Sequence, residues 1–122
     1  MITHYKPSQE YFFEEGIFIN ELSNHDADAA LSIAQARLSS GKKTRWHLLT
    51  NTMERYVIQQ GEGWVEVGEK PPTLVSVGDV VTIKAGIRQR IENRGSADLV
   101  FLALCTPRFD PIAYIDLEDT YA

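Results

Sequence analysis

Between positions 41 and 105 the sequence alternates short runs rich in valine, isoleucine and aromatic residues with breaks at glycine, proline or asparagine. The runs fall at 44–49, 54–60, 63–67, 73–75, 80–83, 89–93 and 99–105. Many short strands at this spacing predict an all-β sandwich or barrel. No helical period of useful length interrupts them, which disfavours a parallel βαβ fold.

The flanking segments are less regular. Residues 17–19 predict a short strand, and residues 29–38 are rich in alanine, which would suit a helix. We favour a strand for 29–38, because its apolar residues nearly alternate and a Ser-Ser-Gly turn follows. The tail from Pro107 to Ala122 contains two prolines and several acidic residues, and we expect it to pack loosely or fray.

The length of 122 residues predicts a single domain, 1–122, with a barrel core at about 29–107. The net charge of -5 does not suit a polyphosphate backbone, so we expect no nucleic-acid partner. The single cysteine, Cys105, excludes an internal disulfide and fits a reducing compartment. Neither a signal peptide nor a long apolar stretch is evident, so we expect a cytoplasmic protein without a membrane partner.

The first motif lies at the start of the regular part of the chain. It places Gly41, His47, Glu54 and Gly61 in order, with Leu49 two residues after the histidine. The spacing resembles the first of two cupin motifs: Gly, five residues, His-x-His, three or four residues, Glu, six residues, Gly. Leu49 stands where that motif has its second histidine.

The second motif follows at a short separation. Gly78, Gly86 and Asn93 match the second cupin motif, whereas Lys84 replaces its proline and Gln89 replaces its histidine. Two such motifs in order, within a strand-rich chain, are much more specific than one glycine pattern. The resemblance implies an all-β cupin double-stranded β-helix, also called a jelly-roll barrel.

In cupins a divalent metal in the barrel lumen is held by the histidines and glutamate of the first motif and the histidine of the second. The resemblance carries over His47 and Glu54, leaves Leu49 unable to ligate, and makes Gln89 a weak amide ligand. A set of His47, Glu54 and Gln89 suits Zn, Fe, Mn or Ni without selecting among them.

Alternation along the strands predicts which side chains share the lumen with His47. Residues two apart lie on one face of a strand, so Arg45, Tyr56 and Gln89 should face the lumen with His47 and Glu54. There they would bind a small ligand. The side chains expected to point away are Trp46, Arg55, Arg88 and Arg90.

Three functions fit these residues. The first is a module that binds a small polar or carboxylated ligand through Arg45, Tyr56 and Gln89, with or without a metal. The alternative is a metal-dependent enzyme of the dioxygenase, isomerase, epimerase or lyase type, with Tyr56 as the catalytic acid or base. The third is a structural partner domain, since cupins often dimerise, and a homodimer is our default expectation.

Each candidate residue also has a purely structural interpretation. In a cupin that has lost its metal, Arg45 would pair with Glu54 and so satisfy a buried charge. Tyr56 would be a hydrogen-bonded core tyrosine. Cys105, late in an apolar run, would be a small buried residue rather than a reactive thiol.

Overall fold

The computed structural model describes residues 1–118, and in that range the chain forms eleven strands and three single-turn 3-10 helices. The strands are β1 (Tyr11–Phe13), β2 (Ile17–Ser23), β3 (Ser32–Leu38), β4 (His47–Leu49), β5 (Met53–Gln60), β6 (Glu62–Val67), β7 (Thr73–Ser76), β8 (Val80–Ile83), β9 (Gln89–Glu92), β10 (Leu99–Thr106) and β11 (Tyr114–Asp116). The 3-10 turns are Pro7–Gln9, Asp26–Asp28 and Pro111–Ala113. Among residues 1–118 there is no helix with the length and hydrophobicity needed to cross a membrane.

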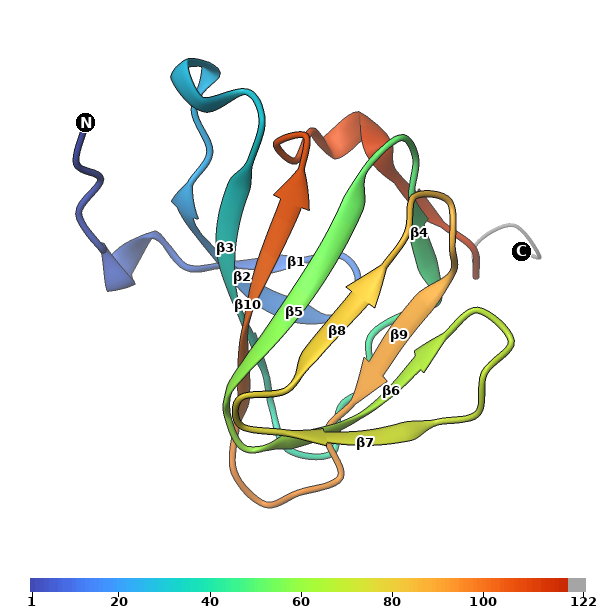
Figure 1. The fold of residues 1–122 in the computed structure, drawn as a ribbon. Coiled ribbons are helices and arrows are strands. Elements are labelled where there is room, and N and C mark those ends of the chain that lie inside the picture. The colour runs from blue at the N-terminus through green and yellow to red at the C-terminus, as the bar shows by residue number, and fades with distance from the viewer. Residues whose placement is uncertain (119–122) are drawn as a thin grey trace.

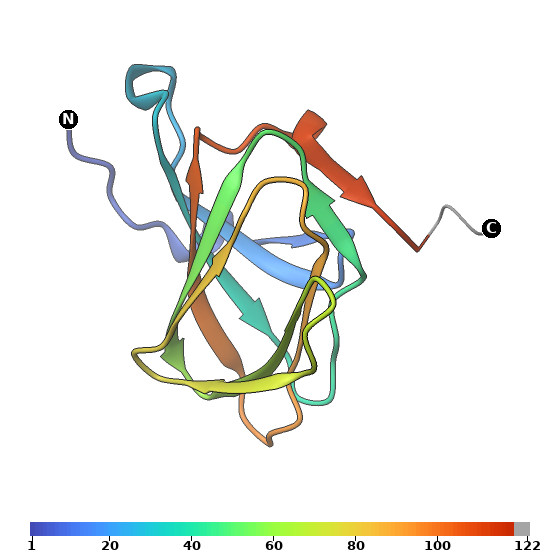
Figure 2. The same cartoon turned by 45° about the vertical axis from the view of Figure 1, so that its right-hand side comes forward.

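The strands form two antiparallel sheets that close into a jelly-roll barrel (Figures 1 and 2). One sheet has the order β1-β2-β3-β10-β5-β8, and the other has the order β11-β4-β9-β6-β7. Neighbours such as β3 and β10 are distant in sequence, which is the crossover that a jelly roll requires. The predicted all-β fold is confirmed.

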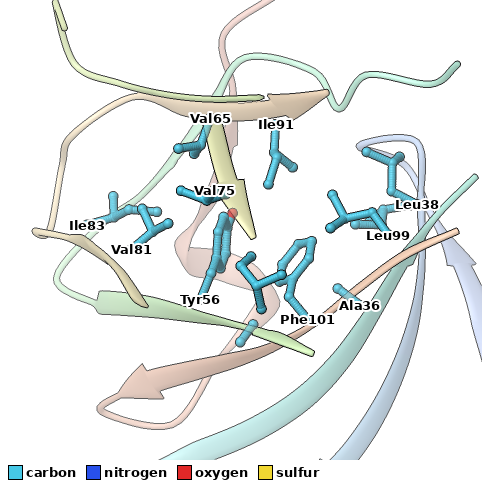
Figure 3. Close-up of a cluster of buried hydrophobic side chains, with 13 residues drawn as sticks. Ala36, Leu38, Tyr56, Val65, Val75, Val81, Ile83, Ile91, Leu99 and Phe101 are labelled. Carbon is cyan, nitrogen blue, oxygen red and sulfur yellow. The ribbon is translucent and has the colours of Figure 1, made fainter. Parts of the chain in front are cut away.

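A hydrophobic core fills the space between the sheets (Figure 3). It is supplied by alternate residues of the strands, for example Leu99 and Phe101 of β10 and Ile58 of β5. Leu99 is fully buried, and a Cβ added to Gly63 would come within 2.8 Å of its Cδ2 atom. The core is therefore closely packed at the end of the barrel where β10 begins.

Residues 29–38 were expected to form a strand, and β3 confirms this over most of the segment. β3 lies between β2 and β10, so both of its edges make backbone hydrogen bonds. Its Ala36 is buried opposite Phe101, where a small side chain leaves room for the ring. Sheet pairing and packing therefore override the helical preference of the alanines.

The expectation of a loosely packed tail was wrong for residues 107–118. Asp110 caps the turn at Pro111–Ala113 by accepting a hydrogen bond from the Ile112 backbone N–H. β11 then pairs with β4, which places Tyr114 opposite Leu49 and Asp116 opposite His47. The tail therefore forms the edge strand of the second sheet, and residues 119–122 lie outside the described range.

Two motif residues are explained by the fold alone. Gly61 has a φ of 75°, and a Cβ at that position would lie 2.8 Å from the carbonyl oxygen of Asp98. The buried Asn93 side chain donates hydrogen bonds to the carbonyls of Leu38 and Ala97. Both residues build the barrel, so their match to the motifs supports the fold and not a particular activity.

Candidate functional site

The end of the barrel where β10 finishes contains a cavity of about 60 Å³. Its walls come from β1 to β5, β10 and the tail, and the polar side chains among them include Glu15, His47 and Glu54. The other lining residues are Tyr11, Phe13, Ile19, Glu21, Asn24, Ser32, Ile33, Ala34, Leu49, Ala103, Cys105, Phe109 and Tyr114. The two motif residues His47 and Glu54 thus face one space, as the sequence predicted.

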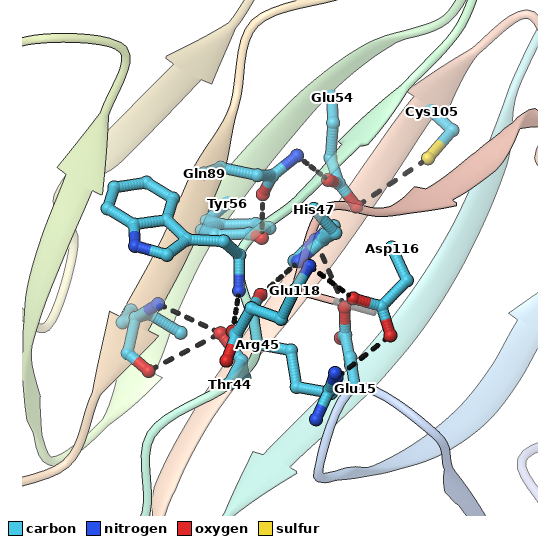
Figure 4. A network of polar contacts seen from close by, with 12 residues as sticks. Glu15, Thr44, Arg45, His47, Glu54, Tyr56, Gln89, Cys105, Asp116 and Glu118 are labelled. Carbon is cyan, nitrogen blue, oxygen red and sulfur yellow. Dashed lines mark hydrogen bonds and ion pairs between the residues drawn. The ribbon is translucent and has the colours of Figure 1, made fainter. Parts of the chain in front are cut away.

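His47 contacts Glu15, a residue of the turn between β1 and β2. The Nε2 atom of His47 lies 3.0 Å from Oε2 of Glu15, and the two side chains are only 3% and 12% exposed (Figure 4). The turn is fixed in place because the Arg45 backbone N–H donates to the Glu15 carbonyl at 2.9 Å. The β1–β2 turn and the start of β4 are therefore joined beside the cavity.

The other ring nitrogen of His47 determines how this contact works. Nδ1 lies 2.7 Å from the carbonyl oxygen of Arg45. A carbonyl oxygen only accepts, so Nδ1 carries a hydrogen and the neutral ring leaves Nε2 as an acceptor. The contact with Glu15 therefore needs one proton between Oε2 and Nε2, and Glu15 and His47 form a dyad that shares it.

Glu54 lies on β5 of the other sheet and is held by a second set of hydrogen bonds, which reach across from Gln89 of β9. Gln89 Nε2 donates to Glu54 Oε1 at 2.8 Å, and the Tyr56 hydroxyl donates to Oε1 of Gln89 (Figure 4). The Cys105 thiol lies 3.8 Å from Glu54 Oε2. Tyr56 and Gln89 are buried behind Glu54 and fix the orientation of its carboxyl group.

Removal from water changes the protonation of all three cavity groups. It raises the pKa of Glu15 to about 8, with a further contribution from the charge of Glu14. It raises the pKa of Glu54 to about 7, and the charge of Glu15 adds to this effect. Desolvation lowers the pKa of His47, so a neutral carboxylic acid hydrogen-bonded to a neutral imidazole describes the dyad better than an ion pair does.

Aromatic rings form the remaining wall of the cavity. Tyr114 of β11 stacks on His47 with ring centroids 5.1 Å apart, and Phe13 meets Tyr114 edge to face at 5.0 Å. Phe109 extends the group through an edge contact with Phe13 at 6.5 Å. The cavity therefore combines three acid–base groups, Glu15, His47 and Glu54, with an apolar surface that suits a small organic ligand.

Arg45 is placed differently from the structural interpretation in which it neutralises Glu54. Its Nε atom donates to Asp116 Oδ2 at 2.8 Å, and its side chain is 35% exposed (Figure 4). Arg45 is not among the described residues that line the cavity. The partner of Arg45 therefore comes from β11, the strand that the sequence did not predict.

The four side chains expected to point away from the lumen do so. Arg88 and Arg90 each lie over the Trp46 ring system, at 4.4 and 4.2 Å from a ring centroid, and Arg90 pairs with Glu66. Arg55 donates to the Thr106 hydroxyl. These contacts belong to the outer surface of the barrel, so strand alternation predicted these four side chains correctly, whereas Arg45, which it placed in the lumen, does not line the cavity.

The arrangement of donor atoms does not suit a divalent metal. Within residues 1–118 no three His, Cys, Asp or Glu side chains are grouped so that they could hold an ion. His47 has a partner on each ring nitrogen, and the amide oxygen of Gln89 accepts from Tyr56. The predicted ligands His47 and Gln89 would have to give up these hydrogen bonds to bind a metal ion beside Glu54.

Sequence reasoning missed Glu15 and Tyr114. Glu15 follows another glutamate and precedes Gly16, a pattern typical of a solvated turn. Tyr114 lies in the tail that was expected to fray. Neither carries a signal in a single sequence, because each reaches the cavity only through strand pairing across the fold.

The fold and the motifs place the chain in a known family. The cupin domain model matches residues 35–105, more than half of the chain, and the chain belongs to the cupin family. Many cupins bind a divalent metal in the barrel, and membership does not identify one here. A comparison with curated proteins found no match.

Solved structures agree with this assignment. A predicted oxalate decarboxylase from Thermotoga maritima is 29% identical, with a TM-score of 0.68 over 75% of this chain and 80% of that one. KdgF from Halomonas sp. is 17% identical, with a TM-score of 0.73 over 84% and 89%. Pac13, described as a unique nucleoside dehydratase, is 12% identical, with a TM-score of 0.76 over 93% and 89%. The last two similarities show the fold alone.

Proposed function

We propose that the cavity is an active site for proton transfer on a small molecule, of the lyase or isomerase type, carried by the chain's own acid and base groups. One observation carries this proposal: the Glu15–His47 dyad and Glu54 face the same cavity, and the pKa of Glu54 is raised to about 7. Carboxyl groups that titrate near neutral pH are suited to general acid–base catalysis.

The two carboxyl groups take different roles between pH 7 and 8. Glu54, with a pKa of about 7, is largely ionised and removes a proton. Glu15, with a pKa of about 8, keeps its proton on the side facing His47. Their environments therefore set one group as the base and the other as the acid.

A β-hydroxy carbonyl compound illustrates the reaction. Glu54 takes the proton from the carbon next to the carbonyl, and the electron pair of that C–H bond forms a C=C bond. The C–O bond to the β-hydroxyl breaks, and the leaving oxygen takes a proton from Glu15 and departs as water. The Glu15 carboxylate then takes a proton from water, which restores its hydrogen bond to Nε2 of His47, and Glu54 releases its proton to water.

The descriptions of three structural neighbours are consistent with a reaction of this type. Pac13 is described as a nucleoside dehydratase, one neighbour as an oxalate decarboxylase and another as a predicted oxalate decarboxylase, and dehydration and decarboxylation are both lyase reactions. This chain is 12–29% identical to those proteins. Similarity at this level supports a shared barrel fold and does not identify the substrate.

The first test needs no substrate. Carbon-detected NMR titration of the glutamate side chains should show Glu54 and Glu15 titrating near 7 and 8, well above the ordinary value of 4.5. Glu54→Gln and Glu15→Gln assign the two signals, and Glu62→Gln on the exposed end of β6 is the control. Titration of both groups near 4.5 would contradict the proposed roles.

The second test measures turnover of simple β-hydroxy ketones such as 4-hydroxybutan-2-one, through the ultraviolet absorbance of the conjugated product. Glu54→Gln should lower the rate by about 10²–10⁴-fold, the usual contribution of a general base. The rate should rise with pH through about 7 and fall above about 8, as Glu54 and then Glu15 lose their protons. An unchanged rate in Glu54→Gln would exclude Glu54 as the base.

Binding without turnover is the second candidate function, and the aromatic wall of the cavity favours it. Ligand contacts by Arg45, Tyr56 and Gln89, a homodimer and a cytoplasmic location stay predictions. A divalent metal on His47, Glu54 and Gln89 would first have to break the hydrogen bonds of His47 and Gln89. A contact of Arg45 with a carboxylated ligand would compete with the Arg45–Asp116 pair.

A further inference from the structure

The hydroxyl group of Tyr114 is the unusual polar atom of the cavity. It is shielded from solvent and has no hydrogen-bond partner among residues 1–118. Other polar groups of the lining are bonded within the protein: Asn24 donates to the Phe109 carbonyl, and Ser32 accepts from the Phe109 N–H. A shielded hydroxyl without a partner costs free energy, so a bound molecule that accepts from it would be favoured.

The charges of the lining restrict what such a molecule can be. Among the described residues the cavity is lined by three glutamates and one histidine, and by no lysine or arginine. The three arginines within two positions of a lining residue are engaged elsewhere: Arg45 with Asp116, Arg55 with Thr106, and Arg108 with Asn24 and Asp26. An anionic ligand would lose its hydration without gaining a counter-charge.

The surroundings of the Tyr114 ring also suit a ligand with both polar and apolar parts. The ring of Tyr114 is packed between His47, which it stacks on, and Phe13, which meets it edge to face. Phe13 and Phe109 offer an apolar surface beside it. Desolvation raises the pKa of Tyr114, so its hydroxyl keeps its proton and acts as a donor.

We infer that the cavity selects an uncharged small molecule with an apolar, planar part for Phe13 and Phe109 and a hydroxyl or carbonyl oxygen that accepts a hydrogen bond from Tyr114. This inference rests on the proposed function, since it assigns the substrate class of the same cavity. It also makes Tyr114 the specificity-determining residue, contributed by the tail.

The test is an NMR titration of the full chain at pH 7 with three one-ring probes: benzyl alcohol, toluene and benzoate. Benzyl alcohol should shift the amide signals around His47 and Tyr114, and benzoate should bind on the order of tenfold more weakly, because its charge finds no partner. Tyr114→Phe should weaken benzyl alcohol about fivefold, the effect of one neutral hydrogen bond, and leave toluene within about twofold. Tyr5→Phe, the same change at an exposed tyrosine, should alter none of these affinities.

Any result that differs from these expectations contradicts a specific part of the inference. Equal affinity for benzoate and benzyl alcohol in the wild-type chain overturns the ligand class, whether or not the variant folds. An unchanged affinity of Tyr114→Phe for benzyl alcohol overturns the role of Tyr114. If no probe shifts the cavity amides, the inference fails as a whole, and the carboxyl titration, which needs no ligand, still decides the proposed function separately.

Discussion

The two ends of the barrel are built from the same strands and differ in chemistry. Along β10 the inward residues begin with Leu99 and Phe101 in the hydrophobic core and end with Ala103 and Cys105 on the cavity wall. β5 shows the same change, from Ile58 in the core to Glu54 in the cavity. One end is filled by apolar side chains, whereas the other holds carboxyl groups that are partly removed from water.

This difference separates stability from function. The apolar end gains free energy by removing large side chains from water. The cavity end gives up some of this free energy near neutral pH, because carboxyl groups with raised pKa values resist ionisation in the folded state. A single barrel therefore supplies rigid support at one end and reactive groups at the other.

The largest effect should come from the apolar end. Leu99→Ala should lower the free energy of unfolding by about 3–5 kcal/mol, because Leu99 is fully buried and closely packed against the Gly63 region. Urea denaturation measures this change. Val100→Ala, at the adjacent outward position of β10, is the control and should cost about 1 kcal/mol or less. A similar loss in both variants would contradict a core confined to the inward positions.

A smaller effect with an opposite sign is expected at the cavity end. A pKa raised from 4.5 to about 7 stabilises the fold below pH 4.5, and this contribution is lost as pH rises to about 7. At 1.36 kcal/mol per unit the loss approaches roughly 3 kcal/mol. Glu54→Gln should therefore be more stable than the wild type at pH 8 and gain little at pH 4. Thermal unfolding across this pH range measures the difference.

Glu62→Gln, on the exposed surface, provides the matched control for that series. Its unfolding curve should follow the wild-type pH dependence throughout. If Glu54→Gln also follows the wild type at every pH, the carboxyl group of Glu54 is not held away from water, and the contrast between the two ends disappears.

The contact between the tail and β4 should contribute less. Asp116→Asn weakens the Arg45–Asp116 pair, which is partly exposed, and should cost about 0.5–1 kcal/mol with a strong dependence on salt. Unfolding in low and high salt measures this change. An equal cost at both salt concentrations would show that packing of β11, rather than charge, holds the tail.

The smallest effect is expected from divalent metals. Added Zn, Mn or Ni should leave the melting temperature of the wild type within about 1 °C, since a ligand that does not bind the folded state cannot stabilise it. Metal analysis of the purified protein, repeated on His47→Ala, is the companion measurement. Stoichiometric metal in the wild type that is lost in His47→Ala would show that the hydrogen bonds of His47 and Gln89 yield to an ion.

The sequence determined the barrel and half of its site. Period-2 alternation, regular turn residues and two motifs predicted the jelly roll, and strand alternation placed His47 and Glu54 in the lumen with Trp46 outside. These predictions succeed because the direction of a side chain on a strand follows from local geometry. Predicting that His47 and Glu54 face the lumen required no knowledge of contacts between residues that are distant in sequence.

Only the tertiary structure decided what surrounds His47 and Glu54. Glu15 reaches His47 across 32 positions of the sequence, and Tyr114 reaches it because β11 pairs with β4. Hydrogen bonding of Gln89 to Glu54 and Tyr56 likewise follows from the closure of the two sheets. Protonation depends on burial and on neighbours that the fold brings together, so the sequence located the carboxylate while the structure made it an acid that titrates near neutral pH.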